Sequence, residues 1–352
     1  MADINVNLRK YENFVFHHST RINTADNIIR RLTHLVHGRY KGNYKDFDFI
    51  AESIYSALNI LNIYHESIFA NREKSRSDPF NRYNKNMLNS SSTYKQIAYS
   101  LSIIKNLEIL IEVGINRKFG SKARYQVITQ IEIIKAVCRL ILFYLSNKRM
   151  LLSTPLLERK TDPSVIVKKE KEENKTTWTG NRTGKKIKNI EFLKGAKNSQ
   201  NVTDYVMSQA LNPDSACDAK DLVRPLPNIR VFGEILYIIK PVVYLILLRE
   251  YGVKSWKPWI VSLTMELFCY ITSTNAIINN SLTSLEQQEY KRRALQLKYY
   301  FIRKPFFDEF IRPTMVKIID IMQDNFILKY GTGFLEFNLH NWDNFYYSTA
   351  GM

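Results

Sequence analysis

The glycine-lysine run from Gly180 to Lys186 comes closer to a catalytic motif than any other part of this sequence. It reads Gly-Asn-Arg-Thr-Gly-Lys-Lys, whereas a phosphate-binding loop has four residues between its glycines and a Ser or Thr after its lysine. Here only three residues separate Gly180 from Gly184, and Lys186 stands where the magnesium-binding hydroxyl would be. A solvated basic loop is therefore the preferred interpretation.

Other residue types that carry chemistry are not grouped. His34 and His37 share a helix face by spacing, but no nearby Cys or Asp completes a metal-ligand set. Glu108 and Glu112 are paired carboxylates by spacing, although such a pair more often marks the polar face of an amphipathic helix. The three cysteines lie far apart in the sequence. We therefore predict no catalytic, cofactor-binding or metal-binding residues, and a protein that is not an enzyme.

Composition narrows the classes of partner. The 352 residues include 51 Lys and Arg against 33 Asp and Glu, for a net charge of +18. Such an excess suits anionic lipid, nucleic acid or acidic proteins. Nucleic acid is the weaker choice because the sequence has no arginine-rich tract and no RNP-type or zinc-finger pattern. The slightly negative mean hydropathy excludes a protein built mostly of transmembrane spans.

Helical periodicity dominates the chain on both sides of one polar region. Residues 146–223 are rich in Lys, Asn, Ser and Thr, so they bury too little apolar surface to offset their ordering entropy. Low Gly and Pro content favours helices elsewhere. The predicted fold is all-α: a membrane-associated helical bundle whose N-terminal half, residues 1–145, and C-terminal half, residues 224–352, are joined by a long disordered basic linker, residues 146–223.

The segment from Phe232 to Ile260 predicts a membrane-seated helix, in preference to a buried helix of a large soluble protein. An apolar run is followed by a collar in which indole rings alternate with lysines, as at a membrane interface. The collar residues are Lys254, Trp256, Lys257 and Trp259. Pro241, inside the apolar run, predicts a helix kink. The kink either forms a hinge or partner groove, or serves packing alone.

Charges interrupt the apolar segments at 125–145 and 229–248, so hydropathy does not separate spanning helices from interfacial ones. A charge inside a bilayer is costly unless it faces protein. Four intramembrane charges are predicted: Glu132, Arg139, Glu234 and Lys240. We expect Glu234 and Lys240 to face the segment that carries Glu132 and Arg139 rather than lipid.

A series of short runs occurs in the order found in one known family. The runs include Tyr11-Glu12-x-Phe14-Val15, Gly38-Arg39-Tyr40, Glu52-Ser53-Ile54-Tyr55-Ser56-Ala57, Glu112-Val113-Gly114, Lys135-Ala136-Val137-x-Arg139, Glu234-Ile235-Leu236-Tyr237-Ile238, Ser255-Trp256-Lys257-Pro258-Trp259 and Arg303-x-Pro305-Phe306-Phe307-Asp308. With these runs the chain resembles the peroxin-sixteen family of peroxisomal membrane-biogenesis proteins. The Trp-Lys-Pro-Trp run is the most specific, and the linker does not match well.

The resemblance implies a peroxisomal membrane protein that also enters the endoplasmic reticulum. It implies a receptor or scaffold that recruits peroxin three and, through it, peroxin nineteen, so that membrane proteins are inserted. It further implies two membrane segments, matching 125–145 and 229–248, and a basic membrane-targeting region with Arg72, Lys74 and Arg76. No nucleic acid or small-molecule substrate is expected. The alternative is a soluble or peripheral helical adaptor that binds acidic partners or anionic lipid.

Both ends of such a two-span protein would be cytosolic, which would place the basic linker in the lumen. The positive-inside tendency does not favour that placement. The linker also holds three glycosylation triplets, at Asn174, Asn181 and Asn201. A lumenal linker predicts that they are candidates for glycosylation in the endoplasmic reticulum.

Overall fold

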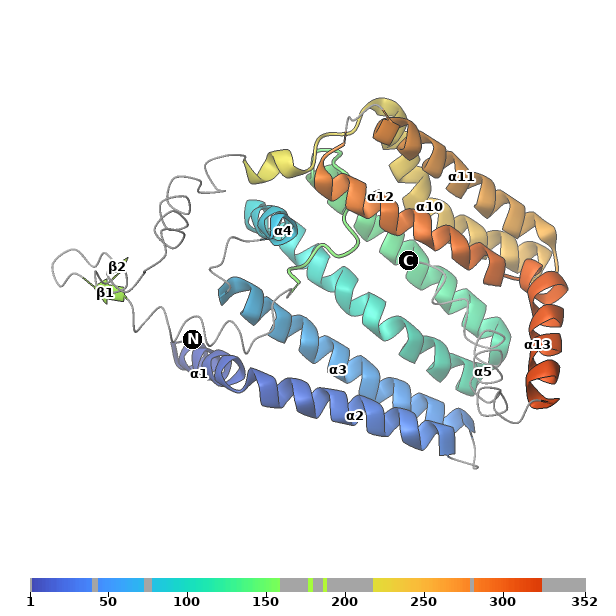
Figure 1. Ribbon diagram of the computed structural model, residues 1–352, viewed down its shortest axis with the longest axis horizontal. Helices are drawn as coiled ribbons and strands as arrows, with labels where there is room; N and C mark the ends of the chain where they lie inside the picture. The colour runs from blue at the N-terminus through green and yellow to red at the C-terminus, as the bar shows by residue number, and fades with distance from the viewer. Residues whose placement is uncertain are drawn as a thin grey trace. The chain divides into compact units, whose positions relative to one another are not determined.

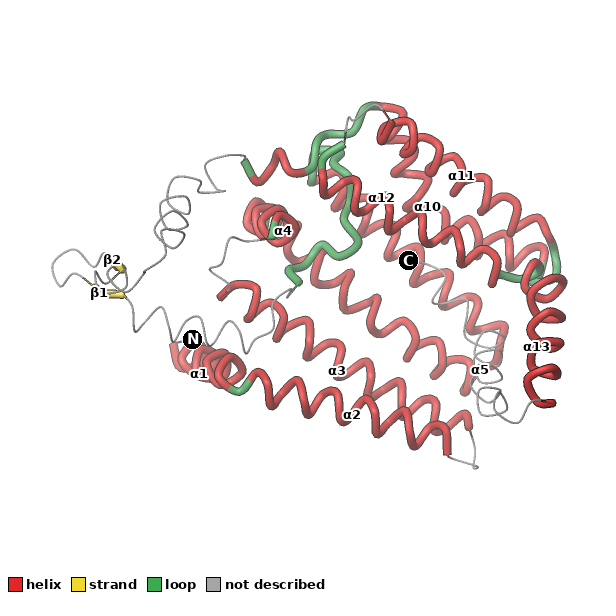
Figure 2. Tube along the Cα trace, in the orientation of Figure 1, coloured by secondary structure: helices red, strands yellow, loops and turns green. Residues whose placement is uncertain are grey.

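The structure is a computed structural model, which describes residues 2–39, 44–72, 78–158, 177–179, 186–188, 218–278 and 282–324. Helices dominate these residues, so the all-α prediction is confirmed (Figure 2). The elements are α1 Ala2–His17, α2 Ser19–Arg39, α3 Tyr44–Arg72, α4 Pro79–Ser90, α5 Ser92–Leu145, β1 Thr177–Thr179, β2 Lys186–Lys188, η1 Ala219–Leu222, α10 Asn228–Tyr251, α11 Trp256–Ile278, α12 Ser284–Gln296, η2 Leu297–Ile302, η3 Phe307–Ile311 and α13 Arg312–Asp324.

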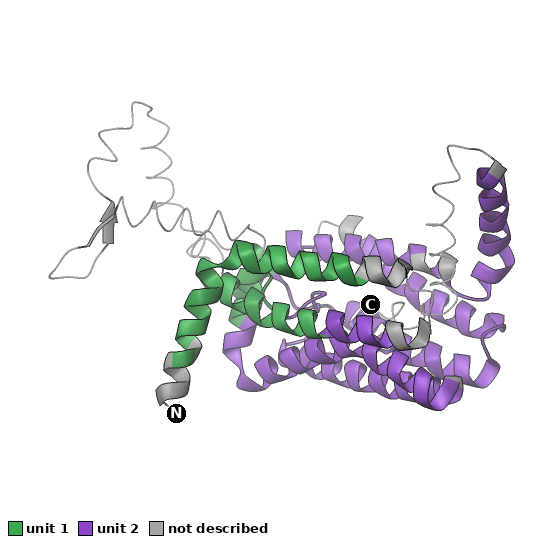
Figure 3. Cartoon of the chain, turned by 90° about the horizontal axis from the view of Figure 1, so that it is seen from below, with its two compact units in different colours: residues 1–42, 57–86, 156–222 green, residues 43–56, 87–155, 223–352 purple. Residues whose placement is uncertain are grey.

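The chain divides into two compact units that are not contiguous in sequence (Figure 3). Unit 1 comprises residues 1–42, 57–86 and 156–222, and unit 2 comprises residues 43–56, 87–155 and 223–352.

Unit 1 is held by a small apolar cluster between α1 and α3. Val15 and Phe16 of α1 pack on Ile68 and Phe69 of α3, and all four are buried. Polar contacts accompany this packing, since the Tyr11 hydroxyl lies 3.0 Å from Nε2 of His65. Burial of these apolar side chains supplies the main stabilisation of the pair.

Unit 2 contains a helical hairpin within α5. Gly120 has φ +80°, a backbone conformation that favours glycine, and interrupts the helix there. The chain then folds back, so that residues 121–145 return along residues 92–119. Arg124 Nε donates to Glu112 Oε1 at 2.7 Å across this hairpin. We call residues 92–119 the first limb of α5 and residues 121–145 the second limb.

The rest of unit 2 is built around α10, which packs against α11 and the second limb of α5 (Figure 1). Ile128, Tyr244, Leu245 and Leu248 form a buried apolar cluster between α5 and α10. Helix α12 begins at a capping box, in which Thr283 and Glu286 satisfy each other's backbone amides. The segments η2 and η3 then lead to α13.

The predicted linker differs from the structure where it is described. Residues 146–158 were assigned to it, yet they are packed, with Met150 fully buried and Leu226 N donating to Lys148 O at 3.0 Å. Apolar residues such as Leu151, Leu152, Leu156 and Leu157 explain this, because they supply the core contacts that the rest of the linker lacks. Most of the remainder, residues 159–176, 180–185 and 189–217, lies outside the described residues, as does the glycine-lysine run up to Lys185. The strands that flank this run, β1 and β2, pair antiparallel.

Candidate functional site

Helix α10 buries two charged side chains within its length and exposes several apolar ones. The buried residues include Glu234, Lys240 and Pro241. Apolar side chains are exposed along the same helix: Ile229 is 65% exposed, Phe232 53% and Ile246 42%. Its exposed charges, Arg249 and Glu250, lie in the last turn. A helix of a soluble protein has the opposite distribution, with charges toward water.

Two neighbouring helices of unit 2 repeat this inverted distribution. On α11, Ser262 and Glu266 are buried, while the exposed apolar residues are Ile260, Val261, Leu267, Tyr270 and Ile271. On the second limb of α5, Glu132 and Lys135 are buried, while the exposed apolar residues are Ile133, Ile134, Val137, Ile141, Tyr144 and Leu145. Apolar surface exposed over several helices marks a membrane or partner contact. We call these three exposed faces together the apolar belt.

Arg293 of α12 is the centre of a buried polar network inside unit 2. Its Nη1 donates to Glu234 Oε2 at 2.6 Å and its Nη2 to Glu234 Oε1 at 2.9 Å, a bidentate pair with α10. Its Nε donates to Glu289 Oε1 at 3.0 Å, and Nη2 also reaches the Leu151 carbonyl at 2.8 Å. The guanidinium carbon lies 4.1 Å from the centroid of the Tyr237 ring. Despite its burial, the pKa of Arg293 is raised by these two carboxylates.

Further buried ion pairs join the helices of the bundle. Lys240 Nζ donates to Glu266 Oε2 of α11. Lys135 Nζ donates to Glu108 Oε2 and to Glu132 Oε1, both at 2.7 Å, and so ties the two limbs of α5 together. Glu108 and Glu112 do share a helix face, as their spacing predicts, but that face is buried inside the hairpin and each glutamate pairs with a cation of the second limb.

Glu108 gives this hairpin a specific pH dependence. Burial raises the pKa of Glu108 to about 7, although Lys135 opposes the shift. Between the ordinary value of 4.5 and about 7, the folded chain holds a proton that the unfolded chain has released, so the free energy of unfolding falls as pH rises through this window. We expect a lower melting temperature at pH 8 than at pH 6, and a weaker dependence in Glu108→Gln. Scanning calorimetry at both pH values tests this. An unchanged dependence in Glu108→Gln would contradict it.

The predicted collar lies at the start of α11 and belongs to an aromatic cluster. The Trp256 and Trp259 rings meet edge to face at 5.4 Å, and Trp259 stacks on Phe306 at 5.6 Å. Trp259 Nε1 also donates to the Tyr300 carbonyl at 3.0 Å. Lys257 Nζ lies 4.4 Å from the centroid of the Tyr251 ring, and Lys254 is exposed. The indoles therefore have a packing role as well as the interfacial role, which stays a prediction.

The structure brings together only some of the predicted site residues. Glu234 and Lys240 face protein, but their partners are Arg293 and Glu266 rather than Glu132 and Arg139, which was the expected pairing. Sequence reasoning missed Arg293 and Glu266. The signal for Glu266 was a lone carboxylate within the apolar stretch of α11, of the same kind that drew attention to Lys240.

Three other predictions concern the kink of α10, the targeting region and the membrane spans. Helix α10 continues through Pro241, and its kink stays a prediction. Lys74 and Arg76 lie outside the described residues, as does the side chain of Arg72. Among the described helices one, α10, is long and apolar enough to cross a membrane, by length and composition only. In the described part of the chain no three metal-binding side chains come together.

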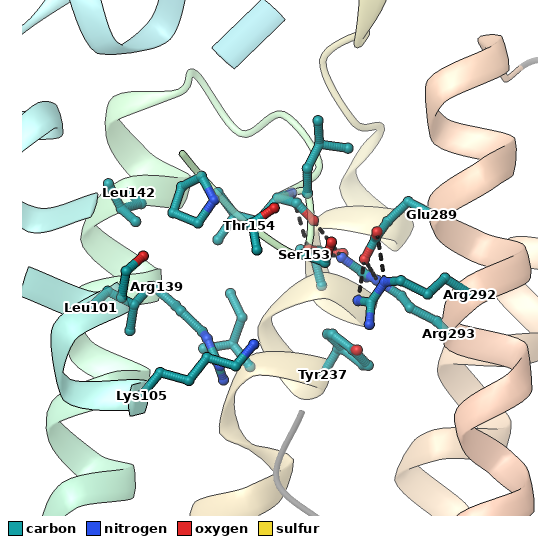
Figure 4. Close-up of a pocket in the computed structure, with 16 residues that line it drawn as sticks. Leu101, Lys105, Arg139, Leu142, Ser153, Thr154, Tyr237, Glu289, Arg292 and Arg293 are labelled. Atoms are coloured by element: carbon teal, nitrogen blue, oxygen red, sulfur yellow. Dashed lines mark hydrogen bonds and ion pairs between the residues drawn. The ribbon is translucent and has the colours of Figure 1, made fainter. Parts of the chain in front are cut away.

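A small cavity opens beside the Arg293 network (Figure 4). Its volume is about 60 Å³. Its walls come from both limbs of α5, from residues 151–155, from α10 and from α12, all within unit 2. Lys105 and Arg139 extend from α5 on one side, and Glu289, Arg292 and Arg293 lie on the other (Figure 4). We call this cavity the basic pocket.

Comparison with known proteins shows which family the chain belongs to. The model of one family, described as Peroxisomal membrane protein (Pex16), matches residues 9–344. The chain belongs to this family. It is therefore a Pex16-family membrane protein of peroxisome biogenesis, and not an enzyme. The peroxisomal membrane is the location of the family, and the resemblance seen in the sequence is confirmed.

Individual relatives of this Pex16-family protein support the same family assignment. The chain is 25% identical to Peroxisome biogenesis protein 16 of Arabidopsis thaliana over 302 residues, which cover 74% of this chain and 78% of the relative. It is 42% identical to Peroxisome biogenesis factor 16 of Dictyostelium discoideum over 86 residues, covering 24% and 22%. It is 19% identical to Peroxisomal membrane protein PEX16 of Schizosaccharomyces pombe over 237 residues, covering 62% and 63%. No solved structure matches the chain.

Proposed function

We propose that this Pex16-family protein is seated in the peroxisomal membrane by the apolar belt of unit 2. The observation that carries the proposal is the inverted distribution on α5, α10 and α11, where buried charges are paired and apolar side chains are exposed. Within a bilayer, apolar side chains on the outside of the bundle contact the lipid tails favourably. Charged side chains are tolerated there when they face the bundle interior and pair with one another. A soluble adaptor would leave this surface against water.

We further propose that the seated protein is a receptor or scaffold that recruits peroxin three and, through it, peroxin nineteen, for the insertion of peroxisomal membrane proteins. Support comes from membership of the family and from the resemblance in sequence. Passage through the endoplasmic reticulum belongs to the same proposal.

Loss of the protein in its own cells tests this function. We expect peroxisomal membrane proteins to lose their punctate staining, because their insertion machinery is no longer recruited. Re-expression of the full chain should restore the punctate staining of peroxisomal membrane proteins. Peroxin three should then co-purify with the re-expressed chain. Membranes that persist with their membrane proteins in place, while only matrix import fails, would contradict the proposal.

The collar gives a separate prediction about seating. Indole rings prefer the membrane interface and lysine stems snorkel toward it, so replacing Trp256 and Trp259 by Glu should cause mislocalisation. Because both indoles also pack against other side chains, the matched control is Trp256→Phe with Trp259→Phe, which keeps aromatic packing. Fluorescence microscopy of tagged chains checks the result. Normal localisation and peroxisome number in the Glu variant would refute the interfacial role.

A further inference from the structure

We propose that the basic pocket of unit 2 binds the phosphate group of an anionic lipid. Four cationic side chains and two carboxylates line the pocket, which leaves two positive charges in excess. The cations are Lys105, Arg139, Arg292 and Arg293, and the carboxylates are Glu234 and Glu289.

Both carboxylates of the pocket already form ion pairs with two of its arginines. Glu234 holds Arg293 in the bidentate pair, and Glu289 accepts from Arg292 Nε at 3.0 Å and from Arg293 Nε at 3.0 Å. Arg292 and Arg293 are thereby neutralised in place. The excess positive charge therefore rests on the α5 side of the pocket, on Lys105 and Arg139.

Arg139 has a hydrogen-bond donor that is not used. Its Nη1 is buried and finds no hydrogen-bond partner among the described residues. A buried charged donor without a partner is costly, so such groups point to a missing anion or water. The pKa of Lys105 is lowered, first by partial desolvation and then by the positive charges of Arg139, Lys135 and Arg292. An anion between Lys105 and Arg139 would relieve this repulsion.

The size of the pocket limits the anion. A water molecule needs roughly 10–15 Å³ of such cavity volume. The pocket, at about 60 Å³, accommodates a group of about five heavy atoms on the same scale, which is the size of a phosphate group. It is too small for a nucleoside. Lysine and arginine are the usual protein ligands of phosphate.

The position of the pocket favours a lipid headgroup as the source of the bound phosphate group. Arg139 lies within the last two turns of α5, and Glu234 within the first two turns of α10. The pocket is therefore near one end of both predicted membrane segments, where cationic side chains reach headgroups. The buried side chains of Leu101, Leu142 and Leu152 form an apolar part of the pocket wall, which excludes water from the bound phosphate group. The choice of lipid over free phosphate rests on the membrane seating proposed above, whereas phosphate binding itself does not.

The test compares two double variants of the full-length protein in detergent. Lys105→Gln with Arg139→Gln removes the free cations of the pocket. Lys95→Gln with Lys122→Gln removes two exposed lysines of the same helix and makes the same change in net charge. Thermal shift and binding are measured with phosphatidic acid in mixed micelles, with phosphatidylcholine alone, and with inorganic phosphate.

We expect phosphatidic acid to raise the melting temperature of the wild type and the control, and its binding to the pocket variant to weaken by at least about tenfold. The same shift with inorganic phosphate would support the phosphate site and assign it to a soluble ligand. Equal responses of the two variants to phosphatidic acid would overturn the proposal, because binding would then reflect only the overall charge. Flotation with neutral vesicles reports membrane seating separately, and the pocket variant should float like the wild type.

A single variant keeps the proposal testable if the double variant folds poorly. Arg139→Leu should raise the melting temperature without ligand, since it removes an unpaired buried donor, while abolishing the shift by phosphatidic acid. An arginine with a purely structural role would show a lower melting temperature and an unchanged ligand shift, which would contradict the proposal.

Discussion

Replacing Arg293 by leucine should lower the free energy of unfolding of unit 2 by about 3–5 kcal/mol. The substitution leaves Glu234 and Glu289 buried without the guanidinium that both carboxylates face. It also removes the donor that binds the Leu151 carbonyl. A buried carboxylate without its cation costs far more than the pair contributes when it is intact. Chemical denaturation in detergent, followed by circular dichroism, measures the loss.

The adjacent arginine provides the matched control. Arg292 carries the same side chain on the same helix, but it is half-exposed and pairs only with Glu289 among the described carboxylates. Arg292→Leu should therefore cost no more than about 1 kcal/mol. Combining Arg293→Leu with Glu234→Leu should restore part of the stability, because the unpaired carboxylate is removed as well. Equal losses for Arg292→Leu and Arg293→Leu would show that the buried network does not hold the bundle together.

The second large effect concerns the apolar belt. Replacing Ile246 of α10 and Ile271 of α11 by aspartate places two charges on the surface that we assign to lipid; these side chains are 42% and 57% exposed. A charged side chain costs on the order of 2.5–3.5 kcal/mol at the centre of a membrane helix, and less toward its ends. We expect the double variant to be lost from peroxisomal membranes, as measured by fractionation and immunoblotting.

The same substitution elsewhere separates lipid contact from general disruption. Leu295 of α12 is 57% exposed, but α12 is otherwise rich in polar residues. Leu295→Asp should leave the membrane fraction unchanged, since an exposed apolar residue facing water tolerates the change within about 0.5 kcal/mol. If the Ile246 and Ile271 variant stays in the membrane like this control, then the belt does not contact lipid.

Local patterns were sufficient to predict the helical fold and the key apolar segment. The periodicity of apolar residues and the scarcity of glycine and proline indicated helices on both sides of the linker, and α10 covers the apolar segment that was expected at 229–248. The charges of α10 were expected to face protein, and Glu234 and Lys240 do so. These inferences need only the residues of one segment and the cost of an unpaired charge in an apolar environment.

Pairings between distant residues could not be predicted in the same way. Arg293 lies 59 positions from Glu234, and Glu266 lies 26 positions from Lys240, so only the packing of α10 against α11 and α12 brings them together. The hairpin at Gly120 was missed because a single glycine between two helical patterns also fits a simple break. The packed residues 146–158 were assigned to the linker because their few leucines were averaged with a polar region.

Carbonate extraction of peroxisomal membranes tests the central claim, that the apolar belt of unit 2 is embedded in lipid. Alkaline carbonate releases proteins that are held by charge, which matters for a chain with a net charge of +18, and retains those that are held by apolar contact. We predict that the full chain stays in the membrane pellet. Quantitative release into the supernatant would contradict the account, because a protein attached through its basic surface alone behaves in this way.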